Sequence, residues 1–261
     1  MTNATAPSQV HSKRYLWIFS VLVATVPGLA ALLLMKTGNG LWSIAPFVFF
    51  FGVIPILDTC FGQDPYNPKD DELDALSRDQ YFRVLLFFAV GTFWLSFILA
   101  AVAVSVSDIG TAGYVAMAIS AGVASGSALT VGHELGHRQG VIDGKIALLA
   151  NALSGYGHFR IEHNRGHHVM VATPEDHASS RLGESVWRFA CREIPGGIAR
   201  GWSYEKRRLI ARNEAIWSTK NEILQGYAIT GLVALALIYT LGIAIVPVSY
   251  THLTLPTIYS V

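Results

Sequence analysis

Two short segments of this chain concentrate its histidines. The first histidine segment, residues 133–137, reads HELGH, and the second histidine segment, residues 163–168, reads HNRGHH. Residues four apart on a helix share one face, so His133 with His137 and His163 with His167 are expected to present their imidazoles side by side, and His168 widens the second pair. Neutral imidazole is the commonest protein ligand of transition metals and suits iron, zinc and copper alike. We therefore expect a metal site whose ligands are five histidines: His133, His137, His163, His167 and His168.

The first histidine segment alone allows a second interpretation. It matches the H-E-x-x-H pattern of zinc proteases, in which two histidines hold the metal and the glutamate, here Glu134, is the general base. A catalytic zinc ion needs three protein ligands and one open position. The second segment adds more imidazole than one zinc ion uses, and this surplus favours two metal ions or one ion with a larger coordination shell. Two redox-active irons that bind O2 would use it.

The composition around these segments is that of a membrane protein. Hydrophobic residues make up 52% of the 261 residues and charged residues only 14%, whereas soluble domains carry about a quarter charged residues. A helix crosses a bilayer with roughly 20 apolar residues. We expect an all-α, polytopic membrane helix bundle with crossings at about Tyr15–Met35, Phe82–Val106, Ile109–Val131 and Gly226–Val248, and a shorter one at Leu41–Leu57.

The basic residues predict the orientation of this bundle. Lys13 and Arg14 precede the first apolar stretch, and thirteen of the nineteen Lys and Arg residues lie between Arg138 and Lys220. Cytoplasmic loops carry an excess of such residues. Four crossings after a cytoplasmic amino terminus return the chain to the cytoplasm near Gly132, so the two signals agree. We expect both histidine segments at the cytoplasmic ends of helices, with residues 146–157 as a re-entrant or interfacial helix between them.

The histidine segments and their neighbours resemble one enzyme family. Residues 164–168 (NRGHH) are followed by residues 171–176 (VATPED) and by Ser179 and Ser180, and Arg138 follows the first segment. With residues 54–58 (IPILD) and 61–65 (FGQDP), these motifs are similar to those of the integral-membrane alkane 1-monooxygenases. The similarity runs from about Tyr15 to Val246. The broader superfamily includes fatty-acid desaturases and xylene monooxygenases.

This resemblance implies a function. Members of the family bind two iron ions through their histidines, activate O2 and hydroxylate the terminal methyl group of a linear alkane taken from the bilayer. Electrons reach them from NADH through rubredoxin reductase and rubredoxin. We expect the same activity here, in a bacterial inner (cytoplasmic) membrane and with no nucleic-acid partner. A fatty-acid desaturase or a xylene-type methyl monooxygenase of the same superfamily is an alternative, as is the zinc protease.

Polar residues near the two segments are expected to support the ligands. A metal-binding histidine commonly donates its second ring N–H to a carboxylate, and the nearby candidates are Glu134, Glu162, Glu175 and Asp176. His158, shortly before the second segment, is a candidate for the same surroundings. The basic segment Arg181–Lys220 is interpreted as a surface that steers an acidic electron carrier, or equally as the charge bias of a cytoplasmic loop or a contact with anionic lipid.

The carboxyl-terminal part departs from the family pattern. The family carries further histidines downstream, in an Asn-Tyr-x-x-His segment and a His-Ser-x-His-His cluster, and neither is present after Glu222. We therefore expect residues 1–248 to form an incomplete membrane domain and residues 249–261 to be a non-native or disordered tail. His252 in that tail is not expected to bind metal. With five imidazoles for two irons, the chain is expected to bind iron weakly or incompletely.

Overall fold

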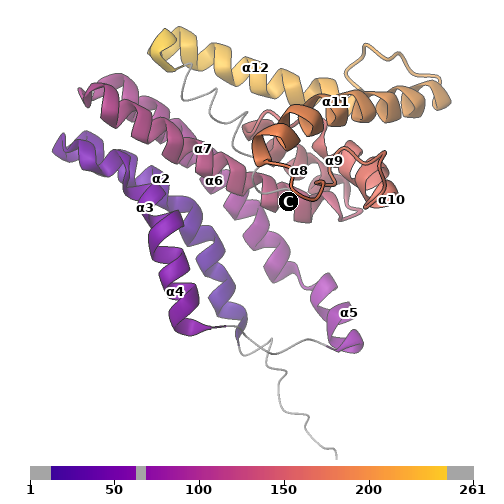
Figure 1. Ribbon diagram of the computed structural model, residues 1–261, viewed down its shortest axis with the longest axis horizontal. Coiled ribbons are helices and arrows are strands. Elements are labelled where there is room, and N and C mark those ends of the chain that lie inside the picture. Colours follow the sequence, from indigo (N-terminus) through magenta and orange to yellow (C-terminus); the bar gives the residue numbers. More distant parts are fainter. Residues whose placement is uncertain (1–12, 63–68, 246–261) are drawn as a thin grey trace, which may run out of the picture.

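The structure is a computed structural model that describes residues 13–62 and 69–245 (Figure 1). The predicted tail 249–261, with His252, and motif residues 63–65 lie outside these ranges. Within them the chain is helical and contains no strand. The elements are η1 (Arg14–Trp17), α2 (Ile18–Thr37), η2 (Gly40–Ser43), α3 (Ala45–Val48), η3 (Phe49–Val53), α4 (Ile54–Phe61), α5 (Asp70–Arg78), α6 (Gln80–Val106), α7 (Gly110–Gly136), α8 (Val141–Leu153), α9 (Phe159–Glu162), η4 (His163–His167), α10 (His168–Met170), α11 (Val186–Ala211), α12 (Glu222–Leu241) and η5 (Ile243–Ile245).

Four helical stretches are long and apolar enough to cross a membrane. They are Arg14–Thr37, Gln80–Val106, Gly110–Gly136 and Glu222–Leu241, and they contain most of each of the four long stretches predicted from the sequence. The predicted all-α polytopic bundle is therefore confirmed. The third stretch differs at its end: α7 continues beyond the expected Val131 to Gly136. Most of the first histidine segment is thus the last turn of a membrane-spanning helix.

The predicted fifth crossing is shorter than the other four. Its apolar helical run, Ala45–Phe61, is interrupted by the π-helical turn η3, which precedes Pro55 at the start of α4. Proline has no backbone N–H to donate within a helix. A local change to a π-helical turn accommodates the missing hydrogen bond. At 1.5 Å per residue the run extends about 25 Å, against about 30 Å of bilayer hydrocarbon. Figure 1 shows α3 and α4 running back along α2.

Small residues allow the long helices to pack closely. Helices α2, α6 and α7 bury alanines at their contacts, including Ala24, Ala100, Ala101, Ala121 and Ala128. A Cβ added at Gly28 of α2 would lie 2.9 Å from Ser96 Oγ on α6, and that hydroxyl donates to the Ala24 carbonyl at 2.7 Å. Between membrane helices such close backbone approach supplies the packing energy, because lipid offers no hydrophobic drive for helix association.

Helix α8 connects the two histidine segments. It begins at Val141, five residues before the expected start at Ile146, and it is packed against α7 and α12. Beyond it, Gly157 touches α12 backbone to backbone: a Cβ at Gly226 would lie 2.6 Å from the Gly157 Cα. Only glycine permits this approach. It fixes the turn before α9, so that α8 to α11 gather at one end of the bundle (Figure 1).

Candidate metal centre

The first histidine segment lies at the carboxyl end of α7. His133 is in the last turn of the helix and His137 is the residue that caps it. The helical spacing of four residues places the rings on one face, with centroids 4.6 Å apart. Their Nε2 atoms are 3.2 Å apart. The pairing predicted from the sequence is therefore present.

The second histidine segment uses a different backbone. Residues His163–His167 form the π-helical turn η4, between the short helices α9 and α10. A π-helix has a wider turn than an α-helix, so residues five apart, rather than four apart, share a face. His163 and His168 are consequently the close pair, with Nε2 atoms 3.0 Å apart. The ring of Phe159 stacks on His163 with centroids 4.9 Å apart and orients it.

The two pairs meet. His133, His137, His163 and His168, the four-histidine group, each offer one ring nitrogen such that all four atoms lie within 4.8 Å of one another. Ring centroids of His133 and His163 are 4.5 Å apart, and those of His137 and His168 are 4.8 Å apart. The amide of Asn164 donates to the Gly136 carbonyl at 2.8 Å and ties the second segment to the end of α7.

The spacing of these nitrogens suits a shared metal ion. Two nitrogens that each lie about 2.1 Å from one ion are separated by about 3.0 Å at right angles and about 3.4 Å at the tetrahedral angle. The two pairs in the structure, at 3.2 and 3.0 Å, fall in this range. Burial, and then the neighbouring histidines, lower the pKa of His163 to about 3. Burial also lowers the pKa of His137. Both rings are therefore neutral near pH 7, which is the form that binds metal.

The fifth candidate, His167, stands beside this group rather than in it. Its ring stacks on His163 with centroids 5.2 Å apart. Its Nδ1 is bonded to Asp176 Oδ2 at 2.8 Å, so Nε2 is the nitrogen left for a metal. A carboxylate on the far nitrogen is the usual arrangement for a ligating histidine. The predicted role of Asp176 thus has a matching contact, with His167 as its partner.

Asp176 is itself held by several donors. It is buried, and it accepts hydrogen bonds from Ser179 Oγ at 2.6 Å and from Arg200 Nη2 at 2.8 Å. Burial raises the pKa of this carboxyl, but the hydrogen bonds from Ser179, Arg200 and His167 outweigh it and hold the pKa well below its ordinary value. Asp176 is therefore ionised and fixed in position next to His167.

Arg200 is the residue that the sequence interpretation missed. It extends from α11, pairs with buried Glu162 through Nε at 2.7 Å and through Nη2, and also bonds Asp176. Its Nη1 donates to the Glu175 carbonyl at 3.1 Å. Burial raises the pKa of Glu162, and the hydrogen bond and charge of Arg200 oppose that shift. The guanidinium thus joins the residue before the second segment to the loop after it.

Other basic residues of α11 are also used internally. Arg192 pairs with Glu184 at 2.7 Å and donates to the carbonyls of His177 and Ser179 at 2.8 and 2.9 Å. Arg208 pairs with Glu205 at 2.6 Å. Much of the basic segment that the sequence suggested as a docking surface therefore stabilises the fold. Lys206 and Arg207 are exposed.

His158 belongs to a separate buried cluster. Its Nδ1 is 2.8 Å from the Tyr227 hydroxyl, and burial lowers its pKa to about 4. Buried Glu193 lies close by, since a Cβ at Gly197 would be 3.4 Å from both Glu193 Oε1 and His158 Nε2. Burial raises the pKa of Glu193 to about 7. His158 thus faces α12 and α11 rather than the four-histidine group.

The remaining acidic candidates lie at the surface. Glu134 and Glu175 are exposed. In residues 13–62 and 69–245 no hydrogen bond or ion pair joins either carboxylate to a histidine. Of the predicted supporting residues, Asp176 touches a candidate ligand directly and Glu162 acts through Arg200.

Comparisons with known proteins identify the relatives of this chain. A family model described as fatty acid desaturase matches residues 109–260. The chain is 40% identical over 241 residues to alkane 1-monooxygenase 1 of Alcanivorax borkumensis, which covers 92% of this chain and 60% of that protein. It is 40% identical over 240 residues to the alkane 1-monooxygenase of Pseudomonas putida (92% and 58%), and 30% identical over 253 residues to that of Acinetobacter baylyi (95% and 62%). The chain thus spans about three fifths of the length of these relatives, and the resemblance predicted from its motifs is confirmed.

Proposed function

This chain belongs to the fatty acid desaturase family, and from that premise we propose that its histidines hold two iron ions for the terminal hydroxylation of linear alkanes by O2. The observation that carries the proposal is the convergence of four ring nitrogens, from two segments, within 4.8 Å. A single N–H···N hydrogen bond between the two rings of each pair would explain the short distance within that pair. It would not explain why the two pairs lie together. The alkane 1-monooxygenase relatives supply the reaction class.

Each part of the site has a proposed task. The four-histidine group would hold metal through its ring nitrogens, and His167 would add Nε2 while Asp176 holds its Nδ1. Bound iron would supply the redox chemistry with O2 that an unactivated C–H bond requires. Because imidazole ligands bring no negative charge to the metal, the site gains positive charge on loading. Ionised Asp176 is the nearby compensating charge, and Arg200 keeps it in place.

The membrane setting fits an apolar substrate. An alkane has no polar group to recognise, so it can be positioned only by shape among apolar side chains and delivered from the bilayer. Four helical stretches are long and apolar enough to span a membrane, and one of them, α7, carries His133 in its last turn. We place the chain in a bacterial inner membrane with its N-terminus and both histidine segments on the cytoplasmic side, where the basic residues concentrate.

Electrons would come from a soluble carrier. For the relatives' reaction class we propose rubredoxin, reduced by an NADH-dependent rubredoxin reductase. Exposed Lys206 and Arg207 on α11 remain available to attract such an acidic protein, since Arg192, Arg200 and Arg208 are engaged in internal ion pairs.

The test measures metal and product together. Residues 1–261 in lipid nanodiscs, and a chimera that adds the carboxyl-terminal part of the Pseudomonas putida relative, are loaded anaerobically with Fe(II) or Zn(II). Reduced rubredoxin, O2 and octane, p-xylene or a fatty acyl substrate are then supplied. We expect iron binding that is lost in His133→Ala but kept in His177→Ala, and 1-octanol from the iron-loaded chimera only. A desaturated acyl chain or a benzylic alcohol as the main product would select the alternatives within the family. Zinc-dependent peptide cleavage would overturn the proposal.

A further inference from the structure

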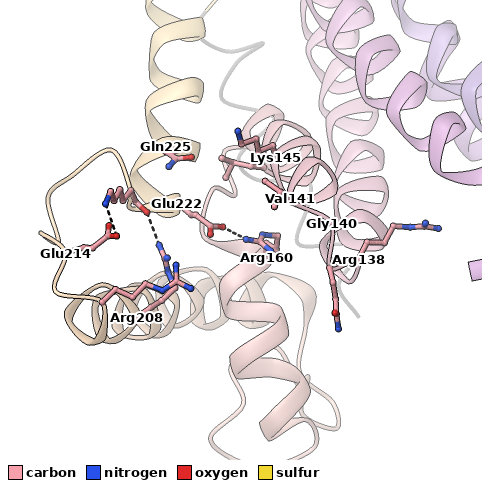
Figure 2. A pocket seen from close by; sticks show the side chains of 14 residues that line it. Arg138, Gly140, Val141, Lys145, Arg160, Arg208, Glu214, Glu222 and Gln225 are labelled. Carbon is pink, nitrogen blue, oxygen red and sulfur yellow. Dashed lines mark hydrogen bonds and ion pairs between the residues drawn. The ribbon is translucent and has the colours of Figure 1, made fainter. Parts of the chain in front are cut away.

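A polar cavity lies apart from the histidines. It has a volume of about 450 Å³ and opens between α8, the end of α11, the start of α12 and the turn after α7 (Figure 2). Its wall includes six basic residues but only two acidic ones, Glu214 and Glu222. The basic residues are Arg138, Lys145, Arg160, Arg208, Arg212 and Lys220.

The positive charge of this cavity is only partly neutralised. Arg160 pairs with Glu222, and Lys220 pairs with Glu214 at 2.8 Å. Arg208 pairs at 2.6 Å with Glu205, which does not line the cavity. Within the described residues, Arg138, Lys145 and Arg212 have no carboxylate partner. Figure 2 shows the Arg160–Glu222 pair at the centre of the cavity, with the Arg138 side chain pointing away from it. Lys145 and Arg212 therefore supply the excess.

Unused hydrogen-bonding groups accompany this charge. Arg160 Nε is buried and has no partner in the part of the chain that the structure describes. Helix α8 begins at the cavity wall, and no side chain caps its start, because the N-cap residue is Gly140 and the carboxylate of the first turn, Asp143, is paired with Arg83 at 2.7 Å. An uncapped helix start favours an anion. Glu214 Oε2 is likewise buried without a partner and calls for a donor, such as a hydroxyl group.

The cavity also lies at the level where membrane helices end. The α7 span ends at Gly136 and the α12 span begins at Glu222, and residues at both ends line the cavity. Val141 and Ile142 at the start of α8 are 76% and 58% exposed, although both are apolar. Trp217 is 77% exposed. Tryptophan concentrates where hydrocarbon meets the headgroups. The cavity is thus basic inside, and exposed Val141 forms part of its wall.

We propose that this cavity binds the headgroup of an anionic, hydroxyl-bearing phospholipid such as phosphatidylglycerol. The phosphate lies against Lys145, Arg212 and the start of α8, and a headgroup hydroxyl donates to Glu214. Basic pockets at the ends of membrane helices bind lipid headgroups in this way. The bound lipid neutralises the excess charge where α8, α11 and α12 meet, and so stabilises the end of the bundle that carries the histidines.

The test compares two double variants with the same loss of charge. The variant K145Q/R212Q changes two cavity residues that have no carboxylate partner, and the control K206Q/R207Q changes two exposed residues outside it. Each full chain is placed in nanodiscs of phosphatidylcholine with increasing phosphatidylglycerol. Bound lipid is counted by mass spectrometry after transfer to detergent, and the thermal unfolding midpoint is followed. A further arm adds inorganic phosphate to pure phosphatidylcholine nanodiscs.

We expect the wild-type chain and the control to retain phosphatidylglycerol and to gain thermal stability from it. The cavity variant should bind the lipid roughly tenfold to thirtyfold more weakly, as expected for two lost cations near a membrane surface. Equal losses in both variants, or no retention by the wild type, would overturn the proposal. A stability gain of the same size from inorganic phosphate alone would also overturn it, because the occupant would then be a free anion.

Discussion

The two histidine segments reach nearly the same nitrogen spacing through different backbones. In the first, on regular α7, residues four apart give an Nε2 separation of 3.2 Å; in the second, on the π-turn η4, residues five apart give 3.0 Å. This nitrogen spacing therefore does not require one particular local fold. What matters is that each backbone brings one pair of nitrogens to the same point.

The two segments also differ in what holds them. The first is supported by close helix packing, for a Cβ at Gly132 would lie 2.2 Å from Asn151 Oδ1 of α8. The second is supported by buried charges, with Arg200 between Glu162 and Asp176. A buried charge that loses its partner is strongly destabilising. The second segment should be the vulnerable one.

Removing Arg200 tests this difference most severely. Arg200→Met leaves Glu162 and Asp176 buried without their cation, and we expect a loss of about 3–5 kcal/mol in the free energy of unfolding. Chemical unfolding in detergent measures it, and Arg188→Met, an exposed site on the same helix, is the control. The double variant R200M/E162Q should recover part of the loss. If Arg200→Met changes stability no more than the control does, the ion network does not support the second segment.

Single histidine substitutions test whether the two segments share one site. We expect His133→Ala and His163→Ala each to weaken metal binding by more than about 100-fold, since even residues that only orient ligands contribute 10- to 100-fold. Competition with a chelator measures the affinity, with His177→Ala as the control. If the segments held separate ions, each variant would instead lose one ion and keep the other at normal affinity.

The sequence predicted one segment better than the other, for a physical reason. His133 and His137 could be paired because α-helical spacing is regular, and the spans followed from length and hydropathy. The pairing of His163 with His168 could not be predicted, because the residue types in this segment do not indicate a π-helical turn. Arg200 was hidden for another reason: it pairs with Glu162, 38 residues away. Such a contact depends on tertiary structure, so in the sequence it was only one of many basic residues.

The buried cluster beside the second segment gives a pH test. The pKa of His158 is lowered to about 4, so its contribution to stability is lost as the pH falls from about 6.5 to 4. The pKa of Glu193 is raised to about 7, so its contribution is lost as the pH rises from about 4.5 to 7. In the wild type, the pH dependence of stability from His158 and that from Glu193 therefore have opposite signs.

Substitution should separate these slopes. Between pH 4.5 and 6.5, Glu193→Gln should become more stable as the pH rises and His158→Gln less stable, each by about 2–3 kcal/mol. Unfolding free energies at several pH values, taken relative to the wild type, measure the change. If the unfolding free energies of the wild type and both variants change with pH in parallel, folding does not shift the pKa of either group. The pH dependence would then not report on this region.

A pair of glycines offers the finest comparison of the two segments. A Cβ at Gly166 would lie 2.7 Å from Arg200 Nε and 2.9 Å from Glu162 Oε1, between the two ends of the ion pair, whereas one at Gly136 would meet only the flexible Arg160 side chain, with Cγ at 3.3 Å. Alanine gains about 1 kcal/mol over glycine inside a helix. We expect Gly166→Ala to lose about 1–3 kcal/mol in spite of that gain, by overpacking. Gly136→Ala should stay within about 1 kcal/mol of the wild type. Thermal unfolding of both variants measures these changes. Equal losses of stability would show that packing constrains the two segments alike.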